Sequence, residues 1–323
     1  MQSDLQKKIH SSEVKCSKWM KEHFGWLNAW LELVRLPNLF TVFGDALMGV
    51  SLAMLALGVQ LTTGRVLCVC LASLFLYSFG VSLNDLVDAE ADARHRPERP
   101  IPSGRISRMA ALSFAIFLGL CGVVFAGLCG NLSCLISLVL VVLIVAYNLV
   151  LKKNAVAGAV GMGLCRAMDV ALGASLAGVS MSMLFPILGT GVFIALVTLL
   201  ASREEHTQYP QANVFLPALA FGAAWLLGFP FLVANVPLIC VWQSLMFLLV
   251  AIALSWWFAV LVYNKTVAAA QYQAFIGKQL LCLLPWQFAW VKLACYGYFW
   301  QTAILCAVAY VLARLLARCY KQS

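Results

Sequence analysis

Five of the thirteen acidic residues in this chain lie between positions 85 and 98, directly after an apolar run long enough to cross a membrane. If a helix continues through this stretch, Asn84, Asp88 and Asp92 recur at i, i+4 and i+8 and share one face. Asp85 lies three residues before Asp88 and joins that face. Mg²⁺ prefers hard oxygen ligands and is usually held by one or two carboxylates together with substrate phosphates. The stretch therefore predicts a Mg²⁺ site at the end of a membrane helix.

Arginines follow this acidic row at Arg94, Arg96 and Arg99. Guanidinium groups bind phosphate oxygens in a bidentate manner. Carboxylates for a metal beside arginines for a phosphate indicate diphosphate chemistry on a lipid. The alternative is a solvated turn whose arginines follow the positive-inside rule, and the helical spacing of the carboxylates disfavours it.

The pattern Asn-Asp-x-x-Asp-x-x-x-Asp at 84–92, followed by Arg-Pro-x-Arg-Pro-Ile-x-x-Gly-x-Ile-Ser at 96–107, resembles the first aspartate-rich motif of the UbiA superfamily of intramembrane prenyltransferases. In that family this segment binds Mg²⁺ and the diphosphate of an isoprenoid donor. The resemblance implies an all-α membrane bundle around a central cavity that opens to the cytoplasmic side. The segment Leu-x-Arg-Leu-Pro-Asn at 33–38 also resembles the start of that fold, where Asn38 would face the cavity.

The composition independently indicates an integral membrane protein. Hydrophobic residues make up 63% of the chain and charged residues only 11%, whereas soluble domains carry about 25% charged residues. The net charge of +9 comes from basic residues clustered at helix ends, which favours anionic lipid head groups as partners and not nucleic acid. The twelve cysteines form no CxxC pair, so neither a zinc site nor a disulfide framework is predicted.

Nine or ten membrane helices are expected, because a span needs about 20 apolar residues. The apolar runs are 38–58, 66–83, 109–129, 132–151, 157–179, 184–201, 214–235, 239–263, 278–292 and 295–317. The run 278–292 is short and contains Pro285, which leaves the number open. The distribution of Lys and Arg favours ten crossings with the N-terminus and the motif loops in the cytoplasm, whereas the family more commonly has nine.

The domain organisation predicted is a single transmembrane domain at 37–318 with a short tail at 319–323. Residues 1–36 are polar to amphipathic, and an apolar stripe recurs through Met20, Phe24, Leu27 and Leu31. Such a stripe is typical of an interfacial helix; a solvated tail is the alternative.

A second cluster, Tyr147, Lys152 and Lys153, lies at the predicted cytoplasmic end of a helix. A Tyr and a Lys five residues apart there can reach a bound diphosphate together, and this spacing resembles a UbiA element with that role. A lysine pair beside an interfacial tyrosine is the structural alternative.

Arg166 and Asp169 lie within the apolar run 157–179. Ionisable residues inside a membrane normally face a cavity or a partner. They either pair with each other across three residues or form a polar wall of the substrate cavity, and both readings stay open. Asp45 is a weaker candidate of the same kind.

The resemblance breaks at the second aspartate-rich motif, which in UbiA enzymes follows the sixth helix. Here the sequence reads Ser-Arg-Glu-Glu-His at 202–206, similar to the divergent EboC-like branch. Glu204 or Glu205 is expected to hold a reduced second Mg²⁺ site, and Arg203 to contribute charge toward the phosphate. His95 and His206 are each single histidines in a loop and are expected to be solvated.

These patterns predict a Mg²⁺-dependent membrane prenyltransferase that takes a prenyl diphosphate donor and an unidentified hydrophobic acceptor. The expected catalytic residues are Asp85, Asp88, Asp92, Lys152 and Glu204; the expected substrate-binding residues are Asn38, Asn84, Arg96, Arg99, Tyr147, Lys153, Arg166, Asp169 and Arg203; and the expected metal ligands are Asn84, Asp85, Asp88, Asp92, Glu204 and Glu205. One alternative is a non-catalytic binder or transporter of a small lipid on the same scaffold. Another is a lipid phosphotransferase in which His95 acts beside the metal.

Overall fold

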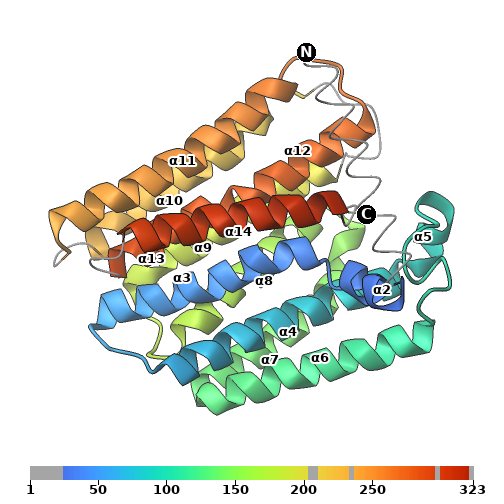
Figure 1. The fold of residues 1–323 in the computed structure, drawn as a ribbon, viewed down its shortest axis with the longest axis horizontal. Helices are drawn as coiled ribbons and strands as arrows, with labels where there is room; N and C mark the ends of the chain where they lie inside the picture. The colour runs from blue at the N-terminus through green and yellow to red at the C-terminus, as the bar shows by residue number, and fades with distance from the viewer. Residues whose placement is uncertain (1–24, 203–209, 233–235, 295–298, 320–323) are drawn as a thin grey trace.

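The computed structural model describes residues 25–202, 210–232, 236–294 and 299–319, which fold into helices joined by short turns (Figure 1). The helices are α2 (Gly25–Leu33), α3 (Leu39–Leu57), α4 (Thr63–Val87), α5 (Ala89–His95), α6 (Arg108–Cys129), α7 (Asn131–Leu149), α8 (Ala155–Ala174), α9 (Leu184–Ala201), α10 (Leu216–Leu232), α11 (Leu238–Val262), α12 (Ala269–Leu281), α13 (Leu283–Ala294) and α14 (Phe299–Cys319). The 3-10 turns η1 (Leu36–Asn38) and η2 (Leu151–Lys153) lie before α3 and after α7.

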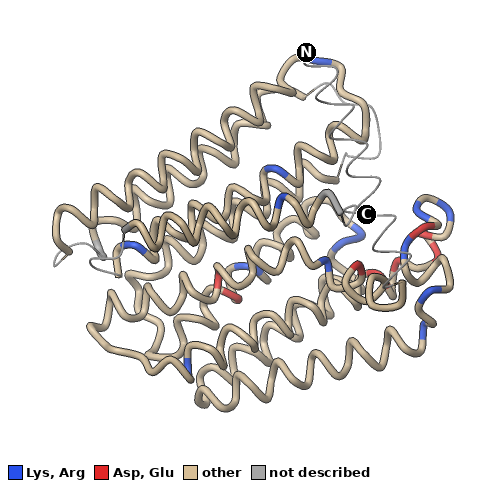
Figure 2. Tube along the Cα trace, in the orientation of Figure 1, with Lys and Arg blue, Asp and Glu red and all other residues tan. Residues whose placement is uncertain are grey.

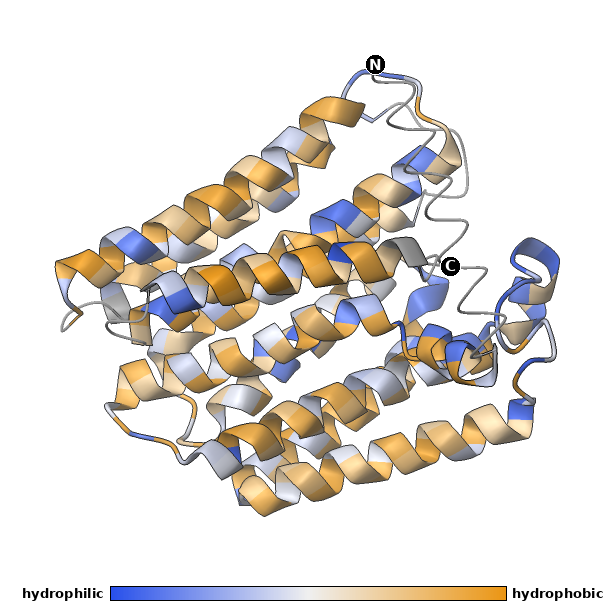
Figure 3. Ribbon diagram, in the orientation of Figure 1, coloured by the Kyte–Doolittle hydropathy of each residue, from blue (hydrophilic) through white to orange (hydrophobic). Residues whose placement is uncertain are grey.

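Nine helices of the described chain are long and apolar enough to cross a membrane, namely α3, α4, α6, α7, α8, α9, α10, α11 and α14. Many large apolar side chains of these helices are exposed, and Figure 3 shows that hydrophobic residues predominate along the helices of the bundle. Such side chains suit lipid tails, which are as apolar as a leucine side chain. The predicted all-α membrane bundle is confirmed.

The segment 278–292, expected as one short helix, is instead divided between α12 and α13, which meet at Cys282. Pro285 explains the break, because a proline is tolerated in the first turn of a helix but interrupts one that arrives from the N-terminal side. The two half-length helices run in succession across the bundle (Figure 1). Neither half is among the nine helices long enough to span a membrane, so a tenth crossing made by the two halves together, which the charge distribution favours, stays a prediction.

Neighbouring helices approach closely where glycines face each other. A Cβ added at Gly49 of α3 would overlap the carbonyl oxygen of Val170 in α8, and one added at Gly173 of α8 would overlap that of Ala46 in α3. Close backbone approach through small residues is the usual way in which membrane helices gain packing energy. This contact fixes α3, which carries the buried Asp45, against α8, which carries the buried Arg166 and Asp169.

Charged residues gather at the end of the bundle where α4 meets α5, and a second, smaller group lies at mid-bundle (Figure 2). The short helix α2 packs on the first group, with Ala29 and Leu33 in one apolar cluster with Ala89, Ile101 and Ile106. The predicted N-terminal stripe is only partly described, since Met20 and Phe24 lie outside the described residues. Leu27 is exposed, and α2 buries the adjacent face instead. The helix packs this face against the motif loop, so the predicted role of the Leu27 face at the membrane interface stays a prediction.

Candidate functional site

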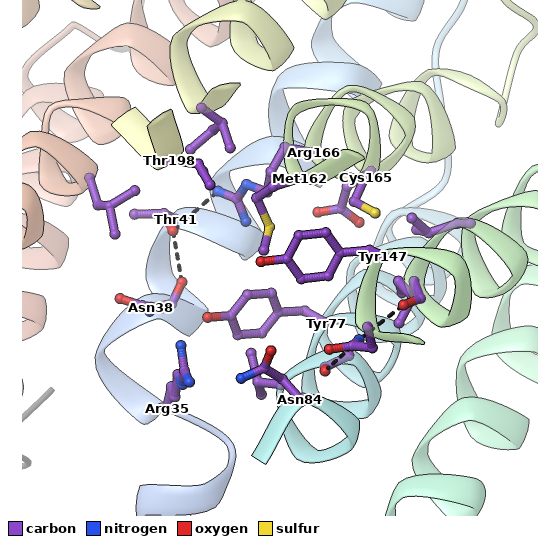
Figure 4. Close-up of a pocket in the computed structure, with 18 residues that line it drawn as sticks. Arg35, Asn38, Thr41, Tyr77, Asn84, Tyr147, Met162, Cys165, Arg166 and Thr198 are labelled. Atoms are coloured by element: carbon purple, nitrogen blue, oxygen red, sulfur yellow. Dashed lines mark hydrogen bonds between the residues drawn. The ribbon is translucent and has the colours of Figure 1, made fainter. Parts of the chain in front are cut away.

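A cavity of about 250 Å³ lies between α3, α4, α7, α8 and α9, beside the end of α4. Figure 4 shows its lining, in which polar side chains from separate helices point toward a common space. Its polar lining residues are Arg35, Asn38, Thr41, Tyr77, Asn84, Tyr147, Asn148, Cys165, Arg166, Asp169 and Thr198. Apolar side chains such as Leu140, Ile144, Met162 and Leu280 complete the wall. The cavity is therefore polar at selected points and apolar between them, as a site for an amphiphilic ligand requires.

The aspartate row does not lie on one uninterrupted helix. α4 ends at Val87, Asp88 forms the junction, and α5 begins at Ala89. The Asp88 amide still donates to the Asn84 carbonyl at 2.9 Å, and the Asp92 amide to the Asp88 carbonyl at 2.8 Å. The helical spacing is nearly kept, but the row divides into two sets with different partners.

Asp85 and Asp92 form the first set and share Arg99. The Arg99 Nη1 lies 2.6 Å from Asp92 Oδ2 and 3.5 Å from Asp85 Oδ1, and all three side chains are buried. The Arg35 Nη2 also lies near Asp85, 3.0 Å from its Oδ1. Burial on its own would lower the pKa of Arg35, but the charge of Asp85 and its hydrogen bond, together with Tyr77 and Tyr147, outweigh burial and hold that pKa above its usual range. Arg99 thus binds carboxylates of the motif and does not line the cavity.

Asn84 and Asp88 form the second set and converge on Lys152. The Lys152 ammonium lies 3.1 Å from Asn84 Oδ1 and 2.6 Å from Asp88 Oδ1. A single cation therefore already sits between an amide oxygen and a carboxylate oxygen at the edge of the cavity. Oxygen donors that converge on a positive charge fit the ligand preference of Mg²⁺. In the described part of the chain, no three His, Cys, Asp or Glu side chains are preassembled as a metal site.

The remaining residues predicted near the diphosphate are distributed unevenly. Tyr147 and Asn38 line the cavity, and Tyr147 points into it together with Tyr77 (Figure 4). Lys153 is exposed on η2, and Arg96 is partly exposed after α5. His95 is exposed, which agrees with a solvated histidine.

The ion pair of Arg166 is with Asp45, so of the two readings left open the mutual pair with Asp169 along α8 is not formed. Its Nη2 lies 2.6 Å from Asp45 Oδ2, and it also donates to the Thr41 hydroxyl at 3.2 Å. Gln287 of α13 donates to both the Asp45 carboxylate, at 2.6 Å, and the Thr41 carbonyl, at 2.7 Å. Arg166 pairs across the helix interface because α3 and α8 are in contact at Gly49 and Gly173, which brings Asp45 beside it.

Asp169 keeps a different partner, the Ser73 hydroxyl of α4, which donates to its Oδ2 at 2.9 Å. Both Arg166 and Asp169 line the cavity. The reading of these two residues as a polar wall of the cavity therefore describes their positions, and the reading as a mutual ion pair does not.

Three of the predicted residues, Arg203, Glu204 and Glu205, lie outside the described residues, as does His206. The described chain reaches Ser202, just past the end of α9. Thr198, one turn earlier on α9, lines the cavity. The second metal site thus stays a prediction.

Arg35, Tyr77 and Gln287 were missed by sequence reasoning. Arg35 belongs to the Leu-x-Arg-Leu-Pro-Asn segment, from which only Asn38 was selected. Tyr77 precedes Asn84 by seven residues, two helical turns, so its position on the same face was readable. Gln287 donates a hydrogen bond to Asp45 of α3, which is 242 positions away in the sequence. A local sequence pattern cannot predict such a contact.

Comparison with known proteins gives a consistent result. The model of the UbiA prenyltransferase family matches residues 45–279. The digeranylgeranylglyceryl phosphate synthase of Methanopyrus kandleri is 36% identical over 132 residues, which are 41% of this chain and 47% of that protein. The chain thus spans about half the length of the curated relatives it matches.

Two solved structures share the fold. A digeranylgeranylglyceryl phosphate synthase superposes with a TM-score of 0.56 at 17% identity, covering 84% of this chain and 99% of the other. A UbiA homolog from Archaeoglobus fulgidus bound to DMAPP and Mg²⁺ superposes with a TM-score of 0.51 at 14% identity, covering 81% and 98%. At these identities the structures establish the shared fold.

Proposed function

Since this chain belongs to the UbiA prenyltransferase family, we propose that it transfers a prenyl group from a prenyl diphosphate to a hydrophobic acceptor in its membrane cavity. The observation that carries the proposal is the convergence of Asn84 and Asp88 on one cation at the edge of that cavity. The groups proposed to bind the diphosphate are thus next to the cavity proposed to hold the prenyl chain.

Mg²⁺ is the proposed cofactor. Asn84 and Asp88 would hold it first, with Asp85 and Asp92 as further oxygen donors of the same motif. When bound, the metal supplies Lewis-acid neutralisation of the diphosphate leaving group. The A. fulgidus homolog bound to DMAPP and Mg²⁺ supports this choice of donor and metal.

The chain's own cations would do the rest of the charge neutralisation. Lys152, once its place beside Asp88 is taken by a metal, keeps a positive charge within reach of the diphosphate. Arg35 and Tyr147 line the same cavity and add donors aimed at the developing negative charge. Preorganised donors of this kind usually give the largest catalytic contribution.

Apolar side chains of α7, α8 and α9 would surround the allylic carbon as its bond to the diphosphate oxygen breaks. Leu140, Ile144, Met162 and Ile194 line the cavity on those helices. Exclusion of water there would protect the allylic cation until the acceptor captures it.

The test is Mg²⁺-dependent binding of geranylgeranyl and farnesyl diphosphate to the purified protein and to Asp88→Asn. We expect binding by the wild type that requires Mg²⁺ and is lost in the variant. The matched control is Glu90→Gln, because Glu90 is an exposed acid two residues away whose carboxylate pairs only loosely with Arg108 at 3.4 Å. Equal affinity in Asp88→Asn and wild type would remove the aspartate row from the metal site.

The second loop is tested by Glu204→Gln in the same preparation. If a second metal assists ionisation, turnover falls more than donor affinity. Donor binding without turnover by the wild type, whatever acceptor is offered, would instead favour a non-catalytic isoprenoid-binding protein. If the protein does not bind prenyl donors and the His95→Ala variant loses activity on a lipid diphosphate, a phosphotransferase would be favoured.

A further inference from the structure

A second pocket, of about 290 Å³, lies between α11 and α12 near the turn that joins them. Lys265 and Lys278 line this α11–α12 pocket together with Thr266 and Gln271, and Phe258 forms part of its apolar wall. No described residue lines both this pocket and the cavity beside the end of α4. The α11–α12 pocket is therefore a separate site, which the proposed reaction does not use.

Lys278 places a positive charge inside the helical part of this pocket. It lies in the third turn of α12 and is only partly exposed, and its ammonium is 5.7 Å from the centre of the Phe258 ring. A cation–π contact stabilises the charge, but it leaves the N–H groups of the ammonium without an oxygen acceptor in the described chain. Ionisable residues at membrane depth normally face a cavity or a partner, and here Lys278 faces the pocket.

The surroundings of Lys278 add positive charge and, among the described residues, no negative charge. Arg314 of α14 is close enough for its charge to oppose that of Lys278. α12 packs mainly on α9, α11, α13 and α14, and the described residues of these four helices include no Asp or Glu. A like charge nearby disfavours the charged form of a partly desolvated group, whereas an opposite charge favours it. An anionic ligand is therefore favoured beside Lys278.

Lys265 supplies a second cation from the turn after α11. Its ammonium donates to the Leu261 carbonyl at 3.0 Å, and since an ammonium has three N–H groups, two remain for a ligand. The Thr266 hydroxyl and the Gln271 amide belong to the same lining and are neutral donors. Lysine commonly binds phosphate as a point charge. This set of donors suits a phosphate group.

The surface next to the pocket favours a phosphate that is attached to a lipid. Leu261 both lines the pocket and is exposed, and the exposed Trp257 and Val250 continue the same face of α11. An acyl chain can lie along these apolar side chains. The turn between α11 and α12 is at the end of the bundle where α4 and α14 end (Figure 1). Basic pockets between membrane helices at the cytoplasmic side bind anionic lipid head groups.

We infer that the α11–α12 pocket binds the phosphate of an anionic phospholipid, with Lys278 and Lys265 as its cations. A zwitterionic head group fits less well, because its own ammonium would meet two lysines. The bound lipid contacts both α11 and α12 and so stabilises their packing. The inference does not depend on the proposed function, because it concerns the outer face of the bundle.

The experiment is native mass spectrometry of the purified full chain, with dioleoyl phosphatidylglycerol and dioleoyl phosphatidylcholine offered in equal amounts. The two lipids have the same acyl chains and differ in head-group charge. A basic residue near a membrane contributes about 1 kcal/mol toward an anionic lipid, which is about fivefold in affinity, so we expect the wild type to prefer phosphatidylglycerol by about 25-fold. Lys265→Gln and Lys278→Gln should each reduce the preference by about fivefold.

Matched variants separate the pocket from the general charge of the protein. Lys278→Arg keeps the positive charge and should keep most of the preference. Arg108→Gln removes an exposed positive charge at the start of α6, outside the pocket, and should leave the preference unchanged. Thermal unfolding in detergent verifies that each variant is folded. Added phosphatidylglycerol should raise the melting temperature of the wild type more than that of Lys278→Gln.

Equal retention of the two lipids by the wild type overturns the inference. A preference that both Lys265→Gln and Lys278→Gln leave unchanged also overturns it. Inorganic phosphate separates the two sources of a phosphate group, and at millimolar concentration it should raise the melting temperatures of the wild type and Lys278→Gln equally. If inorganic phosphate alone stabilises the wild type over Lys278→Gln as much as the lipid does, the pocket takes a free phosphate and the assignment to a lipid is wrong. None of these measurements uses a prenyl donor, so failure of the proposed function is detected separately.

Discussion

Asp85, Asp88 and Asp92 of the motif each carry a charge that is paired within the protein. Arg99 is 4% exposed and is the cation shared by Asp85 and Asp92. A buried pair contributes little over an apolar replacement, but removal of one partner leaves uncompensated charge. Arg99 thus stabilises the fold of the motif.

Arg99→Met should therefore lower the free energy of unfolding by about 3 kcal/mol or more. Thermal unfolding in detergent measures it. The exposed pair of Arg108 with Glu90 gives the control, since Arg108→Gln should change stability by less than about 1 kcal/mol. Equal melting temperatures for Arg99→Met and the wild type would contradict the role assigned to this ion pair.

Lys152 gives a second prediction, because its ammonium occupies the place between Asn84 and Asp88. Lys152→Gln should bind Mg²⁺ alone more tightly, since the competing cation is gone, and should bind prenyl diphosphate more weakly. Titration of each ligand separately measures the two changes. Arg108→Gln, which removes an exposed cation at the start of α6, is the control. A fall in both affinities would mean that Lys152 does not compete with the metal.

Among single residues, sequence reasoning succeeded where spacing carried the information. Asn84 and Asp88 were selected from their helical period, and the structure brings both to one cation. The partners of buried charges were not readable, because Arg166 could reach Asp169 along its own helix or Asp45 across the interface. Only the packing of α3 on α8 decides between them.

At the scale of helices, that packing depends on residues without side chains. Gly49 and Gly173 each meet a carbonyl of the opposite helix, so a methyl group at either position must push α3 and α8 apart. Arg166 on α8 reaches Asp45 and Thr41 on α3, so the separation would also disturb the polar wall of the cavity.

Gly173→Ala should accordingly destabilise the protein by about 1–3 kcal/mol, the usual cost of overpacking. Gly64→Ala is the matched control, because a Cβ there meets nothing within 4 Å and the change should be neutral or stabilising by up to about 1 kcal/mol. Thermal unfolding of the two variants in one detergent makes the comparison. An equal loss of stability in Gly173→Ala and Gly64→Ala would mean that the effect does not come from the α3–α8 contact.

The helices themselves were largely predictable, since each apolar run of sufficient length became one. The α12–α13 pair was not, because α12 carries polar residues that hide it from an apolar-run criterion. Its Gln279 is buried and bonded to Ser255 of α11, with its Oε1 accepting at 2.6 Å. A pattern of apolar residues along the sequence cannot show that a polar side chain is buried by hydrogen bonds to a neighbouring helix.

At the scale of the whole molecule, charge is distributed unevenly along the chain. Residues 206–323 contain six Lys and Arg and no Asp or Glu. The ends of α4 and α14 lie on the same side of the bundle (Figure 1), where most of the charged residues gather (Figure 2). By the positive-inside rule this side is predicted to be cytoplasmic.

Reporter fusions test the topology. A fluorescent protein joined after Ser323 should fold and fluoresce in the cytoplasm, and a periplasmic or lumenal reporter there should stay inactive. With nine crossings, the C-terminal fluorescent protein should be dark and the periplasmic or lumenal reporter active. A reporter at the N-terminus should give the cytoplasmic result in both cases. A reporter placed after Gly130, between α6 and α7, is the positive control for the far side.

The break between α12 and α13 also bears on how the protein is assembled during synthesis. The halves have 13 and 12 residues, fewer than the roughly 20 that a bilayer accepts as an independent span. Neither half is therefore expected to leave the translocation machinery alone, and this crossing must enter together with α11 or α14. Because Leu280 of α12 lines the cavity, the wall of the substrate cavity is expected to close only after this pair has inserted, late in synthesis.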